Sequence, residues 1–336
     1  MLKDMLAKVI HGQDLTELEM STCMGEIMDG DATDAQIGAL ITALRMKGET
    51  IDEVAGAALA MRSRAVRIDA RSSVIVDTCG TGGDGTGTFN ISTTAAFVVA
   101  AAGIAVAKHG NRAVSSGCGS ADLLETLGVN IDAGIETVEE CVQEAGIGFL
   151  FAPRLHPAMK YAAGPRRELG VRSIFNMLGP LTNPGGATAQ LLGVYDARLT
   201  ETFAAVLERL GTKRAFVVCG SDGLDEATVT GETRVSEVDD GLISTYNIDP
   251  LHYFSDVYSL KDLAGGTAET NAEITKAVLS GKKGAPLDVV LLNAGLAIMA
   301  GEKAASLGEG IEIARECIDN GSALKKVQAL IELTNA

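Results

Sequence analysis

Long apolar runs are missing from this sequence of 336 residues. The richest one, residues 95–107, ends at Lys108 and His109 and is shorter than the roughly 20 residues that a membrane-spanning helix needs. The N-terminus carries an early acid, Asp4, and has no apolar stretch of the kind found in a signal peptide. We therefore expect a cytoplasmic protein without a membrane partner.

Paired cysteines and an excess of positive charge are also absent. The six cysteines are scattered and form no C-x-x-C pair, so we expect reduced thiols and no zinc site. The net charge of −16 disfavours nucleic acid as a partner, because a diffuse nucleic-acid-binding surface needs the opposite sign. An acidic protein that binds a polyanion must confine its positive charge to one region.

What is present suits a soluble globular protein. Apolar residues make up 46% of the chain and charged residues 21%, and the length allows one large domain with a smaller companion. Residues 1–71 predict helices only, with Ile37, Leu40, Ile41 and Leu44 on one helical face and Gly48 at a helix end. These apolar stripes form the core of a helical subdomain or, in part, an oligomer interface. Capping boxes predict three helix starts: Asp14 with Glu17, Thr33 with Gln36, and Thr50 with Glu53.

From residue 72 onward, short β-rich runs alternate with helical ones. Strands are predicted at residues 74–76, 104–107, 147–151, 190–194 and 215–219, and helices at 92–102, 120–127, 137–145 and 199–210. Residues 153–186 interrupt the alternation with five prolines and a group of basic residues, and we interpret them as helical turns and loops that cross between the two domains. The alternation predicts a mostly parallel sheet covered by helices, which binds ligands at the carboxyl ends of its strands.

A glycine-rich loop, residues 80–88, directly follows the first predicted strand. Its glycines allow backbone N–H groups to turn toward an anion, and the next helix adds its positive N-terminal end. Glycines 80, 82 and 85 also match G-x-G-x-x-G, but a dinucleotide site needs an acidic residue about 20 positions later, and none lies between Asp84 and Asp122. No lysine follows the glycines, which excludes a Walker A loop. The loop predicts an anion site or, taken alone, a tight surface turn.

Two further segments have the same character. Residues 90–93 open the next helix, where Ser92 is the expected N-cap and where hydroxyl groups would also suit a phosphate or its metal. Residues 108–112 are expected directly after the second strand, and Lys108 and Arg112 are the only fixed charges between Asp84 and Asp122. Together these segments predict an anion-binding region.

Asp225 and Glu226 place two carboxylates side by side. Such neighbours repel each other unless solvent or a cation offsets the charge, and Mg²⁺ commonly binds one or two carboxylates together with substrate phosphates. Alone, such a pair is more often solvated surface. Beside three phosphate-type segments, we interpret it as a magnesium site.

In combination, these segments resemble the anthranilate phosphoribosyltransferase family. The signatures are G-T-G-G-D at 80–84, N-I-S-T at 90–93, K-H-G-N-R at 108–112, G-S-A-D at 119–122, G-L-D-E at 223–226 and the run from V-R-S-I-F-N to L-T-N-P at 171–184. The resemblance covers nearly the whole chain in order. It implies transfer of the 5-phosphoribosyl group from 5-phosphoribosyl-1-pyrophosphate to anthranilate, the second step of tryptophan biosynthesis from anthranilate.

The resemblance also implies roles for individual residues. Magnesium, as two ions, would be held by Ser92, Asp225 and Glu226. Anthranilate would contact Gly80 and Asn111, with Arg166 facing its carboxylate and His109 and His156 near its ring. No covalent nucleophile is expected, and Lys108, Asn111 and Arg166 would act by positioning and electrostatics. The donor would contact Gly80, Gly83, Asp84, Thr88, Asn90, Ile91, Ser92, Thr93, Lys108, His109, Gly110, Asn111, Arg112, Ala113, Val114, Ser115, Ser116 and Ser120.

The fold implied by the resemblance is of the nucleoside phosphorylase/phosphoribosyltransferase type. A small all-helical N-terminal domain, residues 1–71 joined by part of about 160–186, packs on a larger α/β domain, residues 72–336, which has a mostly parallel central sheet covered by helices. The resemblance also implies a homodimer formed through the helical domain.

Two alternatives remain. A pyrimidine nucleoside phosphorylase has a similar fold and a glycine-rich phosphate loop, but K-H-G-N-R and the D-E pair argue against it. A non-catalytic nucleic-acid-binding relative would need a basic surface, which the net charge argues against.

Overall fold

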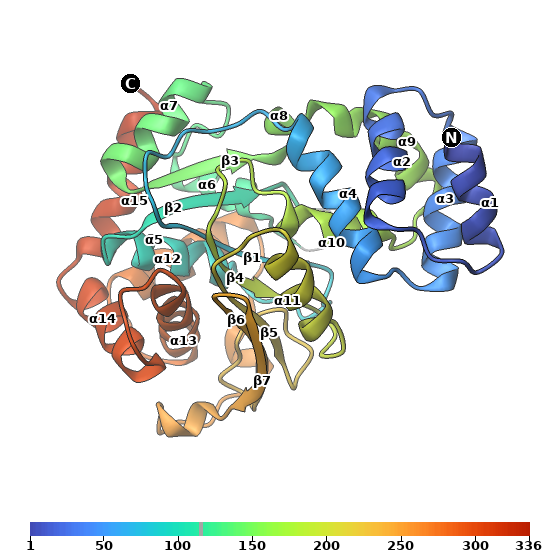
Figure 1. Cartoon of the computed structure of the whole chain (residues 1–336). Helices are drawn as coiled ribbons and strands as arrows, with labels where there is room; N and C mark the ends of the chain where they lie inside the picture. The colour runs from blue at the N-terminus through green and yellow to red at the C-terminus, as the bar shows by residue number, and fades with distance from the viewer. Residues whose placement is uncertain (114–116) are drawn as a thin grey trace.

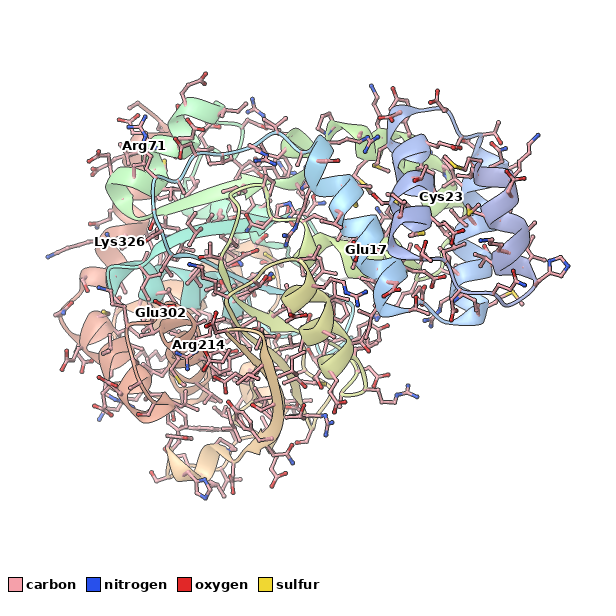
Figure 2. All side chains as sticks on the ribbon, viewed as in Figure 1. Glu17, Cys23, Arg71, Arg214, Glu302 and Lys326 are labelled. Atoms are coloured by element: carbon pink, nitrogen blue, oxygen red, sulfur yellow. The ribbon has the colours of Figure 1, made fainter. Side chains whose placement is uncertain are left out.

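The computed structural model describes residues 1–113 and 117–336, so Val114, Ser115 and Ser116 of the predicted donor site lie outside the described residues. Two parts lie beside each other: a helical bundle that contains the N-terminus and a larger α/β part that contains the C-terminus (Figure 1). No helix among the described residues is both long enough and apolar enough to cross a membrane. All six cysteines are buried, including Cys23 within the bundle (Figure 2).

The bundle is built from the first four helices and two later ones. They are α1 (Leu2–Ile10), α2 (Glu17–Asp29), α3 (Asp34–Lys47), α4 (Ile51–Arg64), α9 (Lys160–Leu169) and α10 (Ile174–Leu178). Helix α9 packs against α2 and α3, and α10 packs against α3 and α4. The chain therefore returns to the bundle after it has formed three strands of the sheet.

Helix starts in the bundle confirm two of the three predicted capping boxes, at Thr33 and Thr50, and Gly48 is the C-cap of α3. The predicted box of Asp14 with Glu17 is wrong. Helix α2 is capped by Thr16, whose hydroxyl accepts from the Glu19 N–H, while the Asp14 carboxylate pairs with Lys47 at 2.6 Å. Thr16 and Glu19 fit the S/T-x-x-E pattern better than the looser Asp form does.

The strands form one seven-stranded sheet with the order β3-β2-β1-β4-β5-β6-β7. The pairs among β1 to β5 are parallel, as predicted, and β6 and β7 add an antiparallel hairpin that was not predicted. The strands are β1 (Ile75–Gly80), β2 (Ala105–Gly110), β3 (Ile147–Phe151), β4 (Ala189–Gly193), β5 (Arg214–Gly220), β6 (Thr233–Asp239) and β7 (Leu242–Ile248).

The remaining helices cover this sheet and its edges (Figure 1). The predicted helix at 137–145 is α7 followed by a π-helical turn, Cys141–Ala145. The helices are α5 (Ile91–Ala101), α6 (Ser120–Leu127), α7 (Ile135–Glu140), α8 (Ala152–Leu155), α11 (Leu199–Arg209), α12 (Ala268–Leu279), α13 (Ala285–Ala300), α14 (Leu307–Asp319) and α15 (Ser322–Thr334).

Two local predictions near the carboxyl edge of the sheet need correction. The N-cap of α5 is Asn90, not Ser92, and its side chain makes no cap bond because its amide is bonded to Cys118 and Asn271. Lys108, the first residue of the third predicted segment, lies inside β2 and not after it. Its side chain is therefore buried against the sheet.

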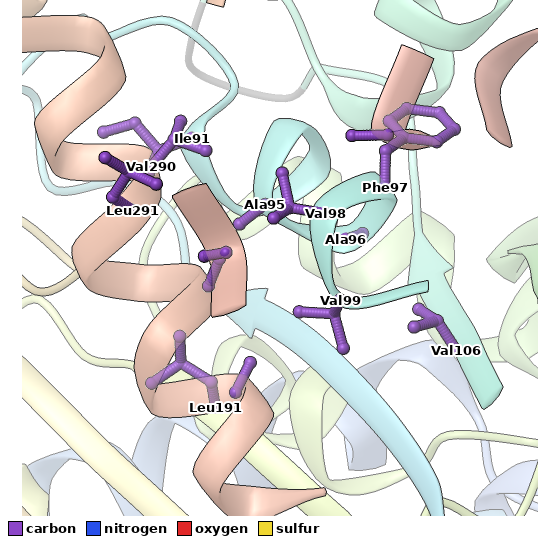
Figure 3. Packing of buried hydrophobic residues seen from close by; sticks show 14 of the residues in the cluster. Ile91, Ala95, Ala96, Phe97, Val98, Val99, Val106, Leu191, Val290 and Leu291 are labelled. Carbon is purple, nitrogen blue, oxygen red and sulfur yellow. The ribbon is translucent and has the colours of Figure 1, made fainter. Parts of the chain in front are cut away.

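Alternating side chains of β4 and β5 enter two separate cores. On one face, Leu191 of β4 packs with α5 and α13, and Figure 3 shows Ile91 beside Val290 of α13. On the other face, Leu192 and Val217 join a core that continues into the helical bundle. This period-two pattern anchors the bundle on the sheet through a shared apolar core.

Candidate active site

The loop that carries Asp225 and Glu226 rests on the carboxyl ends of β1 and β4. A Cβ atom at Gly80, the last residue of β1, would lie 2.3 Å from Oδ2 of Asp225. A Cβ atom at Gly193, the last residue of β4, would lie 1.5 Å from the carbonyl oxygen of Asp225. Both glycines are therefore required by close approach, and the predicted carboxylate pair meets the first predicted loop directly.

The glycine-rich loop between β1 and α5 is fixed at both ends. Near its start, the Gly82 N–H donates to Oδ2 of Asp225 at 2.7 Å. Near its end, the Gly265 N–H donates to the Gly87 carbonyl at 2.9 Å, and Thr88 forms a β-bridge with Ala264. Gly83 has a φ of +71°, a conformation that residues with a side chain rarely adopt.

Arg172, which is not among the predicted site residues, also contacts this loop. The Arg172 guanidinium donates to the carbonyl oxygen of Gly83 and lies 3.9 Å from the ring centroid of Tyr195. Arg172 stands in the V-R-S-I-F-N run, so the family signature contained it, although no local pattern marked it as a loop contact.

Glu226 is buried and Asp225 is half-buried, and little positive charge lies around the pair. Burial, then Glu226 and Asp84, raise the pKa of Asp225 well above its usual value. Burial raises the pKa of Glu226 to about 7, against the opposing effect of Lys108. Its Oε1 accepts from the Ser92 N–H at 3.1 Å, while Oε2 is buried without a hydrogen-bond partner.

These features fit a divalent cation. A bound Mg²⁺ would supply the positive charge that the pair lacks and a partner for the orphaned Oε2 atom. In the described part of the chain, no three His, Cys, Asp or Glu side chains are grouped to hold a metal. An ion here would complete its coordination with other oxygens, such as a hydroxyl, water or phosphate.

Lys108 and Arg112, the two basic residues of the predicted anion-binding region, have different surroundings in the structure. Lys108 is buried, and its Nζ donates to the Thr78 carbonyl at 2.6 Å. Burial lowers the pKa of Lys108 below its usual value. The nearby acids Asp77 and Glu226 favour the charged ammonium form and oppose part of this effect. Arg112 is exposed and pairs with Asp122 at 3.1 Å and Glu125 at 2.8 Å.

The predicted acceptor residues include two histidines that the fold brings into contact. The rings of His109 and His156 lie with their centroids 5.0 Å apart, and both Nε2 atoms are buried without a partner. Burial, with His156 as a second cause, lowers the pKa of His109 to about 3, and burial lowers that of His156 to about 4. Both imidazoles are therefore neutral near pH 7.

The structure also places four other predicted site residues. The Asn111 carbonyl accepts from the Ser120 hydroxyl at 3.2 Å, so two residues of the predicted donor site are hydrogen-bonded to each other. Asn90 donates to the Cys118 carbonyl at 3.1 Å. The guanidinium of Arg166 lies 5.0 Å from the ring centroid of Phe175 and takes part in no salt bridge within residues 1–113 and 117–336.

Comparison with known proteins first defines the class. Residues 3–65 match the family model "Glycosyl transferase family, helical bundle domain", and residues 72–324 match "Glycosyl transferase family, a/b domain". The two parts of the chain are thus those of a glycosyl transferase with a helical bundle domain and an α/β domain.

Full-length relatives give the particular family. The chain is 58% identical to the anthranilate phosphoribosyltransferase of Desulfosudis oleivorans, covering 100% of this chain and 99% of the relative, and 57% identical to that of Moorella thermoacetica, covering 98% of each. The crystal structure of the Thermus thermophilus enzyme matches with a TM-score of 0.94 at 44% identity, over 98% of this chain and 99% of the other. The Saccharomyces cerevisiae enzyme in complex with PRPP and Mg matches with a TM-score of 0.90 at 29% identity, over 99% and 98%. The chain belongs to the anthranilate phosphoribosyltransferase family.

Proposed function

We propose that this chain transfers the 5-phosphoribosyl group from 5-phosphoribosyl-1-pyrophosphate to the amine of anthranilate and releases pyrophosphate, with its active site at the carboxyl ends of β1, β2 and β4. The observation that carries the assignment is the contact of Asp225 with Gly80 and Gly82 and of Glu226 with Ser92. It joins the carboxylate pair to two phosphate-type segments.

The metal ligands are assigned on the same contacts. Ser92, Asp225 and Glu226 would hold Mg²⁺, and two ions are expected because both carboxylates and the donor's pyrophosphate offer oxygen ligands. When bound, the metal neutralises charge on the leaving pyrophosphate. The Saccharomyces cerevisiae relative was solved with PRPP and Mg, which supports the assignment.

Protein groups would stabilise the reaction by fixed charge and position. Breaking the bond from C1 to pyrophosphate leaves positive charge on the ribose and negative charge on the leaving group. Backbone N–H groups of the glycine loop and Lys108 would stabilise the negative charge. The acceptor amine is already a nucleophile, so Asn111 and Arg166 would act by orienting it, with His109 and His156 against its ring. No covalent ribosyl-enzyme forms.

Loss of anthranilate fluorescence after addition of the donor and Mg²⁺ tests this function. The double variant Asp225→Asn with Glu226→Gln should lose nearly all activity at low Mg²⁺. Wild-type protein that consumes neither substrate would overturn the assignment. Release of pyrophosphate, as opposed to phosphate-dependent cleavage of a nucleoside, separates it from a nucleoside phosphorylase.

A homodimer through the helical domain, residues 1–71 with part of about 160–186, is the second part of the proposal. Ile10, Leu18 and Met46 of this domain are 64%, 77% and 84% exposed. They lie at the end of α1, near the start of α2 and near the end of α3. Burial of these side chains would favour association.

A further inference from the structure

Asn293, in the middle of α13, holds the backbone next to the carboxylate pair. Its Oδ1 accepts from the Ala227 N–H at 3.0 Å, and its Nδ2 donates to the Ala227 carbonyl at 2.8 Å. Nδ2 also donates to the Val289 carbonyl at 2.8 Å. A carboxamide can accept and donate at once, so it can bind both polar groups of one residue. Ala227 directly follows Glu226.

Burial of the Asn293 carboxamide in an apolar helix costs free energy unless its polar groups are hydrogen-bonded. Asn293 is 0% exposed, and its helix is buried along almost its whole length among apolar side chains. A buried amide without partners destabilises a core, whereas an apolar side chain of the same shape would not. Both amide hydrogens and the carbonyl oxygen of Asn293 have partners, and two of its three bonds are made to Ala227.

Asp222 holds the chain on both sides of the carboxylate pair. Oδ1 of Asp222 accepts from the Leu224 N–H at 3.1 Å, and Oδ2 accepts from the Thr228 hydroxyl at 2.7 Å. The backbone of Gly193, at the end of β4, packs directly against the Asp225 carbonyl. From outside the loop, Asn293 bonds Ala227 itself, and one residue further along the Thr233 hydroxyl of β6 accepts from the Thr228 N–H at 2.9 Å.

We propose that Asn293 is a positioning residue for the metal-binding carboxylates: by fixing the backbone at Ala227, it sets the direction in which Glu226 points and keeps Asp225 seated on Gly80. The inference rests on the proposed metal role of Asp225 and Glu226, which it deepens. Groups that orient metal ligands are often needed for affinity although they do not touch the ion.

The main test is Asn293→Leu, which keeps the approximate shape of the side chain and removes all three hydrogen bonds. Mn²⁺, observed by electron paramagnetic resonance in the presence of the donor, reports metal binding without catalysis. We expect the Mn²⁺ dissociation constant to rise by about tenfold or more, and the half-saturating Mg²⁺ concentration in the activity assay to rise with it. The KM for anthranilate should stay within about twofold, because the acceptor contacts are untouched.

Thr334→Val is the matched structural control. Thr334 is also buried, and its hydroxyl accepts from the Asn130 N–H at 3.2 Å and donates to the Leu330 carbonyl at 2.7 Å, at the C-terminal end of α15. This variant should lose stability and retain the wild-type Mn²⁺ affinity. If Asn293→Leu does not fold, Asn293→Ser, whose hydroxyl can keep one of the bonds, should show an intermediate loss of affinity.

Parallel titration of the Asp225→Asn, Glu226→Gln double variant separates the two hypotheses. If the double variant loses Mn²⁺ affinity but Asn293→Leu and Asn293→Ser do not, the positioning role is wrong and the metal site stands. If the double variant binds Mn²⁺ as the wild type does, the metal site itself is wrong.

Discussion

Gly80 leaves no room for a side chain, because the carboxylate of Asp225 occupies the space that a Cβ atom would need. Gly80→Ala should therefore displace Asp225 and lower kcat/KM for the donor by about a hundredfold, as expected when a catalytic group is misplaced by about 1 Å. Fluorescence assays at several Mg²⁺ concentrations measure the effect.

Gly38 in α3 is the matched control for this substitution. A Cβ atom there would have its nearest neighbour at 3.9 Å, on Leu169. Gly38→Ala should keep full activity and stabilise the protein by up to about 1 kcal/mol, because alanine favours the helix. Wild-type Mg²⁺ dependence in Gly80→Ala would contradict the proposed contact.

His156 should make the fold sensitive to mild acid. Burial lowers the pKa of His156 to about 4 in the folded protein, compared with about 6.5 in an unfolded chain. As pH falls below about 6.5, the unfolded chain binds a proton that the folded chain does not, so stability falls until about pH 4, by at most about 3 kcal/mol. Urea unfolding at pH 7.5, 6 and 5 should show a shallower loss for His156→Gln than for the wild type. An equally steep loss would show that other groups are responsible.

At the scale of single elements, the cap of α3 can be tested apart from the active site. The Thr33 hydroxyl accepts from the Gln36 N–H, and the Gln36 side chain accepts from the Thr33 N–H. Thr33→Ala should lower the free energy of unfolding by about 1 kcal/mol with unchanged kcat, whereas Thr33→Ser should retain most of the stability. Equal losses in both variants would show that the hydroxyl does not act as the cap.

Local signals in the sequence were enough to predict most elements up to β5. The cap residues Thr33 and Thr50 and the alternation after residue 72 are short-range patterns that the packing keeps. The β6–β7 hairpin carries a signal of the same kind: Asp-Gly between β-rich runs is typical of a tight hairpin turn, and in the structure Asp240 and Gly241 both have positive φ. The prediction of Ser92 as the N-cap of α5 was wrong. The N-cap is Asn90, which is held by residues far away along the chain.

The site could be predicted only where its residues form contiguous segments. Residues 80–84 and the pair Asp225 and Glu226 are visible as patterns, and the fold places them together. Asn293 carries no such signal, because it stands alone in an apolar helix and acts through the backbone of Ala227. Whether Lys108 would face solvent or the interior depended on where β2 ends, which the sequence pattern placed too early.

For the whole molecule, the proposed dimer gives a direct test. Leu18→Glu combined with Met46→Glu adds charge to the exposed apolar end of the bundle and should convert a dimer into monomers, as measured by light scattering coupled to size-exclusion chromatography. Val257→Glu, at a position 81% exposed in the α/β part, is the control and should leave the mass unchanged. A wild-type protein that is already monomeric would exclude the dimer.

The order of strands in the sheet has a consequence for the protein during its synthesis. Strand β1 pairs with β4, so one of its edges stays open until residue 193 has been made, and the support from Asn293 comes later still. At roughly 5–20 residues per second, the ribosome needs roughly 10–40 s to travel from Gly80 to Asn293. For roughly 6–23 s of that time, until residue 193 has been made, the nascent chain carries an unpaired strand edge, and until residue 293 has been made it lacks the support of the proposed metal site. Such a chain should depend on chaperones while it is made, and a pause in translation between β1 and β4 should lower the yield of native enzyme.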